Sequence, residues 1–92
     1  MDITGQWSVS GTTNDNFQVT GSAIINNDGT YSLSLNQAGT SLSESGTYQL
    51  NGSNLIFHSD TTGKETDWQV SNFQGDSFDL TSANQHYLFQ RQ

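Results

Sequence analysis

Cysteine and proline are both absent from this sequence of 92 residues, and only two residues, Lys64 and Arg91, are basic. Without cysteine the chain can form no disulfide, no thiolate metal site and no cysteine nucleophile. With a formal net charge of −7, the chain has no Lys/Arg surface for nucleic acid or an anionic membrane, so neither is an expected partner. No run approaches the roughly 18 consecutive apolar residues of a transmembrane helix.

A targeting segment is also missing from the sequence. No basic start is followed by an apolar stretch, so no signal peptide is expected within these residues. If Met1 is the native start, the protein belongs in the cytoplasm. If Met1 replaces a removed signal, the protein belongs in the periplasm or outside the cell, and the sequence leaves both options open.

Hydrophobic residues make up only 30% of the chain, yet aromatic residues make up 11%. The length predicts one domain, residues 1–92, with a small core that depends on aromatic side chains. Charged residues are only 12%, which argues against a disordered acidic tail. The aromatic residues expected in this core are Trp7, Phe17, Tyr31, Tyr48, Phe57, Trp68, Phe73, Phe78, Tyr87 and Phe89.

Apolar residues alternate with polar ones along nearly the whole chain, and Gly, Asn and Asp interrupt the pattern. Alternation with a period of two predicts strands that have one apolar face, and no segment has a convincing helical period. Turns are predicted at Asp28-Gly29, Ala38-Gly39, Asn51-Gly52 and Ser82–Asn84, among other places. The pattern predicts eight short antiparallel strands, and a closed meander would leave no strand edge exposed.

Two short features of the sequence resemble the lipocalin-like, or calycin-type, β-barrels. Gly5-Gln6-Trp7 opens the first predicted strand, and Arg91 ends the last one. The resemblance implies an all-β, eight-stranded antiparallel up-and-down barrel that Gly5, Trp7 and Arg91 close. It also implies that Arg91 packs across the indole in a cation–π contact of about 0.5–2 kcal/mol. The chain also resembles, though less strongly, the small bacterial barrels that inhibit metalloproteases.

The resemblance implies a non-enzymatic binding protein for a small apolar or aromatic ligand. The residues expected to line one end of the barrel are Trp7, Glu44, Tyr48, Trp68 and Tyr87. Glu44 shares the phase of the apolar residues around it, so it is either a polar anchor in a pocket, with Arg91 as its partner, or turned outward at a bulge. The alternative function is a protein-interaction or inhibitor module on a packed barrel.

Some side chains are expected on the outside of the barrel. His58 and His86 have the outward phase, and a surface position is favoured over a metal site for both, so no metal or other cofactor is expected. Ile24, Ile56, Phe73 and Leu88 are out of phase with the apolar face. If they cluster, they would suit a protein partner or a homodimer, with Ile24, Ile56 and Leu88 as the interface.

Overall fold

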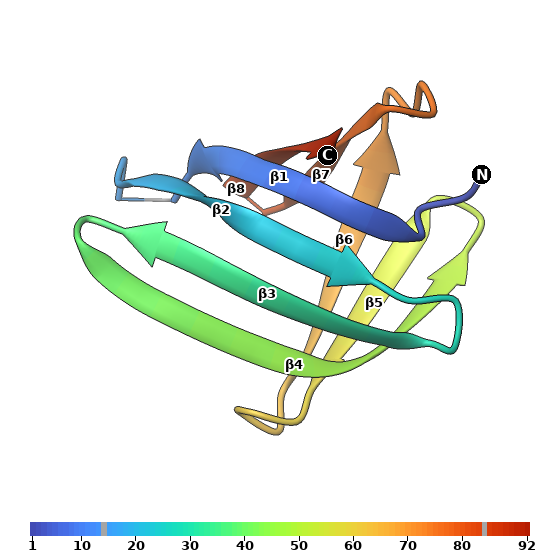
Figure 1. The fold of residues 1–92 in the computed structure, drawn as a ribbon, viewed down its shortest axis with the longest axis horizontal. Coiled ribbons are helices and arrows are strands. Elements are labelled where there is room, and N and C mark those ends of the chain that lie inside the picture. The colour runs from blue at the N-terminus through green and yellow to red at the C-terminus, as the bar shows by residue number, and fades with distance from the viewer. Residues whose placement is uncertain (14, 84) are drawn as a thin grey trace.

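The computed structural model describes residues 1–13, 15–83 and 85–92, and these residues form eight strands (Figure 1). Each strand pairs antiparallel with the next, and β8 pairs with β1, so the sheet closes into a barrel with sequential strand order. The predicted fold class is therefore confirmed. The strands are β1 (Gly5–Thr12), β2 (Gln18–Ile25), β3 (Thr30–Gln37), β4 (Thr40–Asn51), β5 (Asn54–Ser59), β6 (Glu65–Ser71), β7 (Ser77–Ser82) and β8 (Gln85–Arg91).

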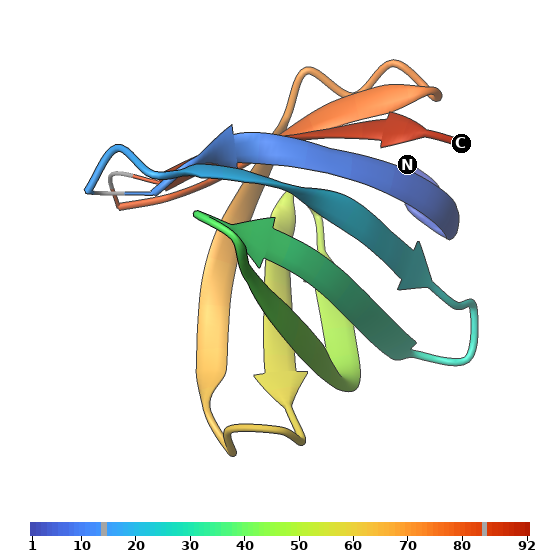
Figure 2. The ribbon, with the colours of Figure 1, turned by 60° about the vertical axis from the view of Figure 1, so that its left-hand side comes forward.

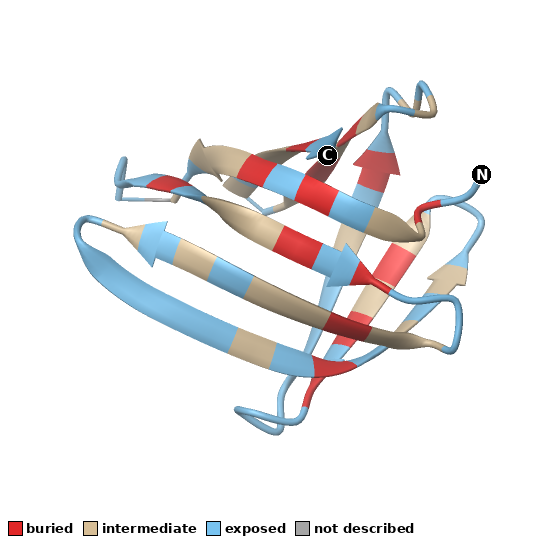
Figure 3. Cartoon of the chain, viewed as in Figure 1, coloured by how far each residue is buried: buried red, intermediate tan, exposed pale blue. Residues whose placement is uncertain are grey.

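The register places residues of the same phase opposite one another on every strand. Trp7 lies opposite Ala23 on β2 and Arg91 on β8, and Leu33 of β3 lies opposite Glu44 of β4. Figure 3 shows the result as buried positions that alternate with exposed or half-buried ones along β1 and β5. The alternation in the sequence therefore predicted which side chains face the interior.

The core is most compact at the end of the barrel where the chain begins. Trp7 and Phe78 are fully buried, and their ring centroids lie 4.7 Å apart in an edge-to-face arrangement. Ile3 precedes the first strand, but it is only 2% exposed, and its carbonyl accepts a hydrogen bond from Nε1 of Trp7 at 2.9 Å. The N-terminal segment therefore covers this end, which we call the closed end.

The opposite end is less well covered because neighbouring strands differ in length. β4 has 12 residues and β5 has 6, and their pairing begins only at Gly46 and Ser59. Among the described residues, the first half of β4 therefore has no partner in β5 and extends beyond it (Figure 2). Leu42 lies on this half and faces inward opposite Leu35, yet it is 49% exposed. We call this end the open end.

Two aromatic residues depart from the sequence prediction. Phe17 was expected in the core but is 46% exposed, because β2 begins only at Gln18 and the chain turns at Asn16, where φ is 65°. Phe73 was counted among the core aromatic residues, but its phase placed it outside; its ring packs against the core, with its centroid 6.2 Å from that of Phe78. β6 ends at Ser71 and Asn72 has a φ of 53°, so the alternation no longer applies at Phe73.

The predicted turns connect the strands as tight hairpins. Gly29 has a φ of 89° between β2 and β3, and both Ala38 and Gly39 have positive φ between β3 and β4. Positive φ at both central residues is the mark of a type I′ turn. Of the turn predicted at Ser82–Asn84, Asn84 lies outside the described residues. In the part of the chain that the structure describes, no helix has the length and apolar character needed to cross a membrane.

Candidate functional site

A cavity of about 190 Å³ lies inside the barrel between the core and the open end. Every strand except β2 contributes a side chain to its wall. β2 contributes Gly21 at this level, between Val9 and Leu35, where an added Cβ would clash with the Ser34 carbonyl oxygen of β3. The lining residues are Val9, Leu33, Leu35, Glu44, Phe57, Thr66, Trp68, Leu80, Tyr87 and Phe89.

Trp68 and Tyr87 form an aromatic wall of this cavity. Their ring centroids lie 5.6 Å apart with the rings tilted, and both side chains are half-buried. The indole Nε1 of Trp68 donates a hydrogen bond to the Thr66 hydroxyl at 3.2 Å, which fixes the ring against β6. The Tyr87 hydroxyl is protonated at neutral pH and can donate a hydrogen bond, and burial raises the pKa of this phenol further.

Glu44 is the one carboxylate in the wall of the cavity. The Tyr31 hydroxyl donates a hydrogen bond to its Oε2 at 2.8 Å. Tyr31 is itself only 2% exposed, and its ring centroid lies 4.5 Å from that of Phe57. Burial raises the pKa of Tyr31, and the hydrogen bond and negative charge of Glu44 raise it further. The buried tyrosine therefore holds the carboxylate in a defined position.

Of the two alternatives for Glu44, the one that faces it inward named Arg91 as its partner, and this pairing is wrong. The Arg91 guanidinium lies at the closed end, where Nη1 donates to the Thr4 carbonyl at 2.7 Å and Nη2 to the Gly75 carbonyl at 2.9 Å. The sequence analysis did not identify Tyr31, which is the residue that pairs with Glu44. Counting back from the Ala38-Gly39 turn places Tyr31 opposite Gly46, two residues along β4 from Glu44, so the signal was present.

Gly5, Trp7 and Arg91 together complete the closed end. The Arg91 Cζ lies 4.2 Å from the centroid of the Trp7 ring, which is the contact that the barrel resemblance implied. Gly5 has a φ of 131°, and a Cβ at this position would lie 2.5 Å from Nη1 of Arg91. The positive φ favours glycine at this position, and an added Cβ would displace the guanidinium.

Of the five residues expected to bind a ligand, the structure brings three together. Glu44, Trp68 and Tyr87 line the cavity. Trp7 is fully buried at the closed end, and the Tyr48 hydroxyl donates to the Asn26 carbonyl at 2.6 Å in the turn after β2, also at that end. All five face inward, but their distances along the barrel axis separate them into two groups.

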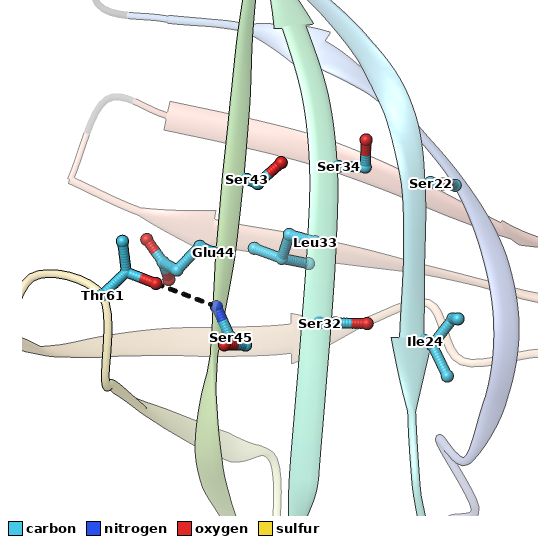
Figure 4. Close-up of a pocket in the computed structure, with 9 residues that line it drawn as sticks. All are labelled: Ser22, Ile24, Ser32, Leu33, Ser34, Ser43, Glu44, Ser45 and Thr61. Atoms are coloured by element: carbon cyan, nitrogen blue, oxygen red, sulfur yellow. Dashed lines mark hydrogen bonds between the residues drawn. The ribbon is translucent and has the colours of Figure 1, made fainter.

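A second, larger hollow lies on the outer face of β2, β3 and β4 (Figure 4). Its volume is about 350 Å³, and five of its nine lining residues are serines, while Leu33 and Glu44 border both this hollow and the interior cavity. Thr61 borders it, and its Oγ1 accepts a hydrogen bond from the Ser45 amide at 3.3 Å. Because this hollow has no aromatic wall and is open to solvent, it buries little apolar surface, and the interior cavity is the better candidate site.

The residues predicted to form an interface do not form one patch. Ile24 is 40% exposed on β2, whereas Ile56 on β5 and Leu88 on β8 are half-buried. Two strands separate β2 from β5 and β5 from β8 around the barrel. The residues opposite these three on neighbouring strands are polar, namely Gln6, Ser32, Gln49, Asp67, Ser10 and Asp79.

The two histidines lie on the outer surface. His86 pairs through Nε2 with Oδ1 of Asp79 at 3.3 Å, and His58 is exposed opposite Glu65. Within residues 1–13, 15–83 and 85–92, no three His, Asp or Glu side chains are close enough to hold a metal ion.

Comparison with known proteins gives a similarity of fold. No protein-family model and no curated protein matches the sequence. The crystal structure of the Cpx pathway activator NlpE from Escherichia coli matches 87% of this chain with a TM-score of 0.63 and 16% sequence identity. The match covers 43% of the NlpE chain, so the present chain corresponds to less than half of that protein.

Proposed function

We propose that this barrel is a non-enzymatic, lipocalin-like binding protein for a small apolar or aromatic ligand. The observation that carries the proposal is the interior cavity of about 190 Å³, whose walls are aliphatic and aromatic except at Glu44 and Thr66. For comparison, an engineered apolar cavity of about 150 Å³ in another protein binds benzene. The cavity therefore suits a ligand with a single ring and a short substituent.

The packing around the cavity supports a binding site rather than a fully packed interior. Leu33, Leu35, Trp68 and Tyr87 face inward and touch the core, yet each is only partly buried. A ligand would remove their remaining apolar surface from water, and each Å² buried contributes roughly 25 cal/mol. All of these side chains lie on paired strands, so little ordering is needed when a ligand binds.

The proposal is tested by filling the cavity. We expect indole to bind saturably in isothermal titration calorimetry. Leu35→Trp places a large ring in the cavity near the open end and should weaken indole binding about tenfold or more. Ser34→Trp is the matched control, because Ser34 is the next residue on β3 but faces outward and is exposed.

Near-ultraviolet circular dichroism would establish that both tryptophan variants remain folded. If indole bound both variants as tightly as the unaltered protein, the interior cavity would not be its binding site. If no indole bound to the unaltered protein, other single-ring compounds would need to bind for the proposal to survive.

The second candidate function is a protein-interaction or inhibitor module. Phe17 and Leu42, which are 46% and 49% exposed, both lie at the open end. Native mass spectrometry of the protein recovered from an extract of its source separates the two candidates. A small adduct lost on denaturation favours the ligand-binding protein. A protein-sized partner that the Phe17→Ser/Leu42→Ser variant no longer retains favours the module.

A further inference from the structure

We propose that the ligand of this cavity carries a protonated amine, and that Glu44 is the counter-ion that selects it. This inference rests on the proposed function and specifies the class of ligand. Glu44 lines the same cavity as the aromatic side chains Trp68 and Tyr87. A carboxylate beside aromatic faces is the combination of groups that recognises an ammonium ion.

Glu44 lacks a cationic partner among the described residues. Within this part of the chain, the Glu44 side chain receives one hydrogen bond, from the Tyr31 hydroxyl, and takes part in no ion pair. A carboxylate that is partly removed from water is stabilised by an opposite charge. An ammonium group bound in the cavity would supply that charge.

The basic residues of the chain do not supply this charge. Arg91 is held at the closed end by the Thr4 and Gly75 carbonyls and by the Trp7 ring. Lys64, the only other Lys or Arg, lies exposed in the loop between β5 and β6, and the described residues show no ion pair for it. The interior therefore offers a negative site with no positive group of its own.

The carboxylate is also oriented before any ligand arrives. The hydrogen bond from the buried Tyr31 hydroxyl occupies Oε2 and leaves Oε1 to accept a bond from a ligand. Figure 4 shows the Glu44 side chain directed toward Thr61, beside the half of β4 that extends past β5. An amine would thus be held near the opening, with its ring deeper in the cavity among Val9, Leu80 and Phe89.

Two further electrostatic effects favour a cation in this position. The net charge of −7 attracts cations to the protein and repels anions of the same shape. The faces of Trp68 and Tyr87 add cation–π attraction, which is strongest where water is excluded. A single-ring arylalkyl amine combines the size that the cavity accepts with the charge that Glu44 requires.

The test compares three probes of the same shape by calorimetry at pH 7.5, namely 2-phenylethylamine, 2-phenylethanol and phenylacetate. We expect the amine to bind about tenfold or more tightly than the neutral alcohol, and the anion to bind most weakly. Glu44→Gln should weaken amine binding about tenfold and leave alcohol binding within about twofold. Glu65→Gln is the matched control, because Glu65 is the other glutamate of the chain and is exposed on the outer surface.

The outcomes separate this inference from the proposed function. If amine and alcohol bind equally well and Glu44→Gln changes neither, the cavity binds ligands but the charge selection is wrong. If none of the three probes binds, the proposed function fails together with the inference. The comparison of amine and alcohol on the unaltered protein remains decisive even if Glu44→Gln does not fold.

Discussion

At the scale of single residues, the closed end depends on the contact that the Arg91 guanidinium makes over Gly5. The Arg91 guanidinium passes over Gly5, lies above the Trp7 ring, and donates hydrogen bonds to backbone carbonyls from two other segments. It thereby joins the N-terminal segment, β1, β8 and the connection after β6. Gly5 contributes through the absence of a Cβ and through a backbone conformation that other residues rarely adopt.

We expect both Gly5→Ala and Arg91→Met to lower the free energy of unfolding in urea by about 2–3 kcal/mol. The alanine adds backbone strain and displaces the guanidinium, and the methionine removes the cation and its hydrogen bonds. The double variant should lose less than the sum of the two, by about 1 kcal/mol, because the clash disappears with Arg91. Strict additivity would contradict the clash.

Lys64→Met is the control for charge removal alone. It also removes one of the two basic residues, but Lys64 is exposed and makes no ion pair among the described residues. Its effect on unfolding should stay within about 0.5 kcal/mol. A loss as large as that of Arg91→Met would mean that net charge, and not the closed-end contact, sets the stability.

At the scale of elements, the hairpins decide which residues face each other. The turn at Ala38 and Gly39 sets the pairing of β3 with β4, and it therefore places Glu44 opposite Leu33 and near Tyr31. Ala38 has a φ of 53° and Gly39 a φ of 84°. Alanine is strained in this left-handed region, whereas asparagine and glycine tolerate it.

Ala38→Asn should therefore raise the free energy of unfolding by about 0.5–1 kcal/mol. Gly39→Ala should lower it by about 1 kcal/mol or more, because an added Cβ would meet no atom within 4 Å and the backbone strain acts alone. Urea unfolding of the two variants measures both effects. If Ala38→Asn were destabilising, the type I′ geometry assigned to this turn would be wrong.

Strand alternation and the stagger between strands also explain how much of the site could be predicted. Alternation showed that Glu44, Trp68 and Tyr87 face inward, because side chains on a strand point to opposite faces in turn. It did not separate these residues from Trp7 and Tyr48, because depth along the barrel depends on the stagger between strands. Phe17 and Phe73 were misplaced because each lies beside a residue with positive φ, outside regular strand geometry.

At the scale of the whole molecule, all three tyrosines have a pKa raised by folding. Burial is the main cause for each, with Glu44 adding to it at Tyr31, and Asp2 and Asp28 adding to it at Tyr48. A tyrosine in the unfolded chain ionises around its ordinary pKa of 10.0, while the native side chain keeps its proton. The stabilisation is complete below that pH and is lost as the pH rises through the folded pKa.

The free energy of unfolding should therefore be level toward neutral pH and fall above about pH 10, by up to about 1.4 kcal/mol per pH unit for each protonated tyrosine. Tyr31→Phe should remove one such contribution and make the alkaline decline less steep. Urea unfolding between pH 8 and pH 11 measures both slopes. Identical slopes would mean that Tyr31 ionises in the folded protein as it does in the unfolded chain.

The class of fold, the number and order of the strands, most turns and the inward-facing side chains could all be predicted from the amino-acid pattern. These features depend on local rules, namely the period of a strand and the tolerance of glycine and asparagine for positive φ. Gly5, Trp7 and Arg91 could also be paired from the sequence through the resemblance.

The position of the open space, and the residues that reach it, follow from the three-dimensional arrangement of the strands. β4 extends past β5, and the N-terminal segment covers only one end. The stagger and unequal lengths of the strands therefore place Glu44 beside Tyr31 and the aromatic wall, and Arg91 at the other end. Stagger and closure involve residues far apart in the chain, so no local pattern encodes them.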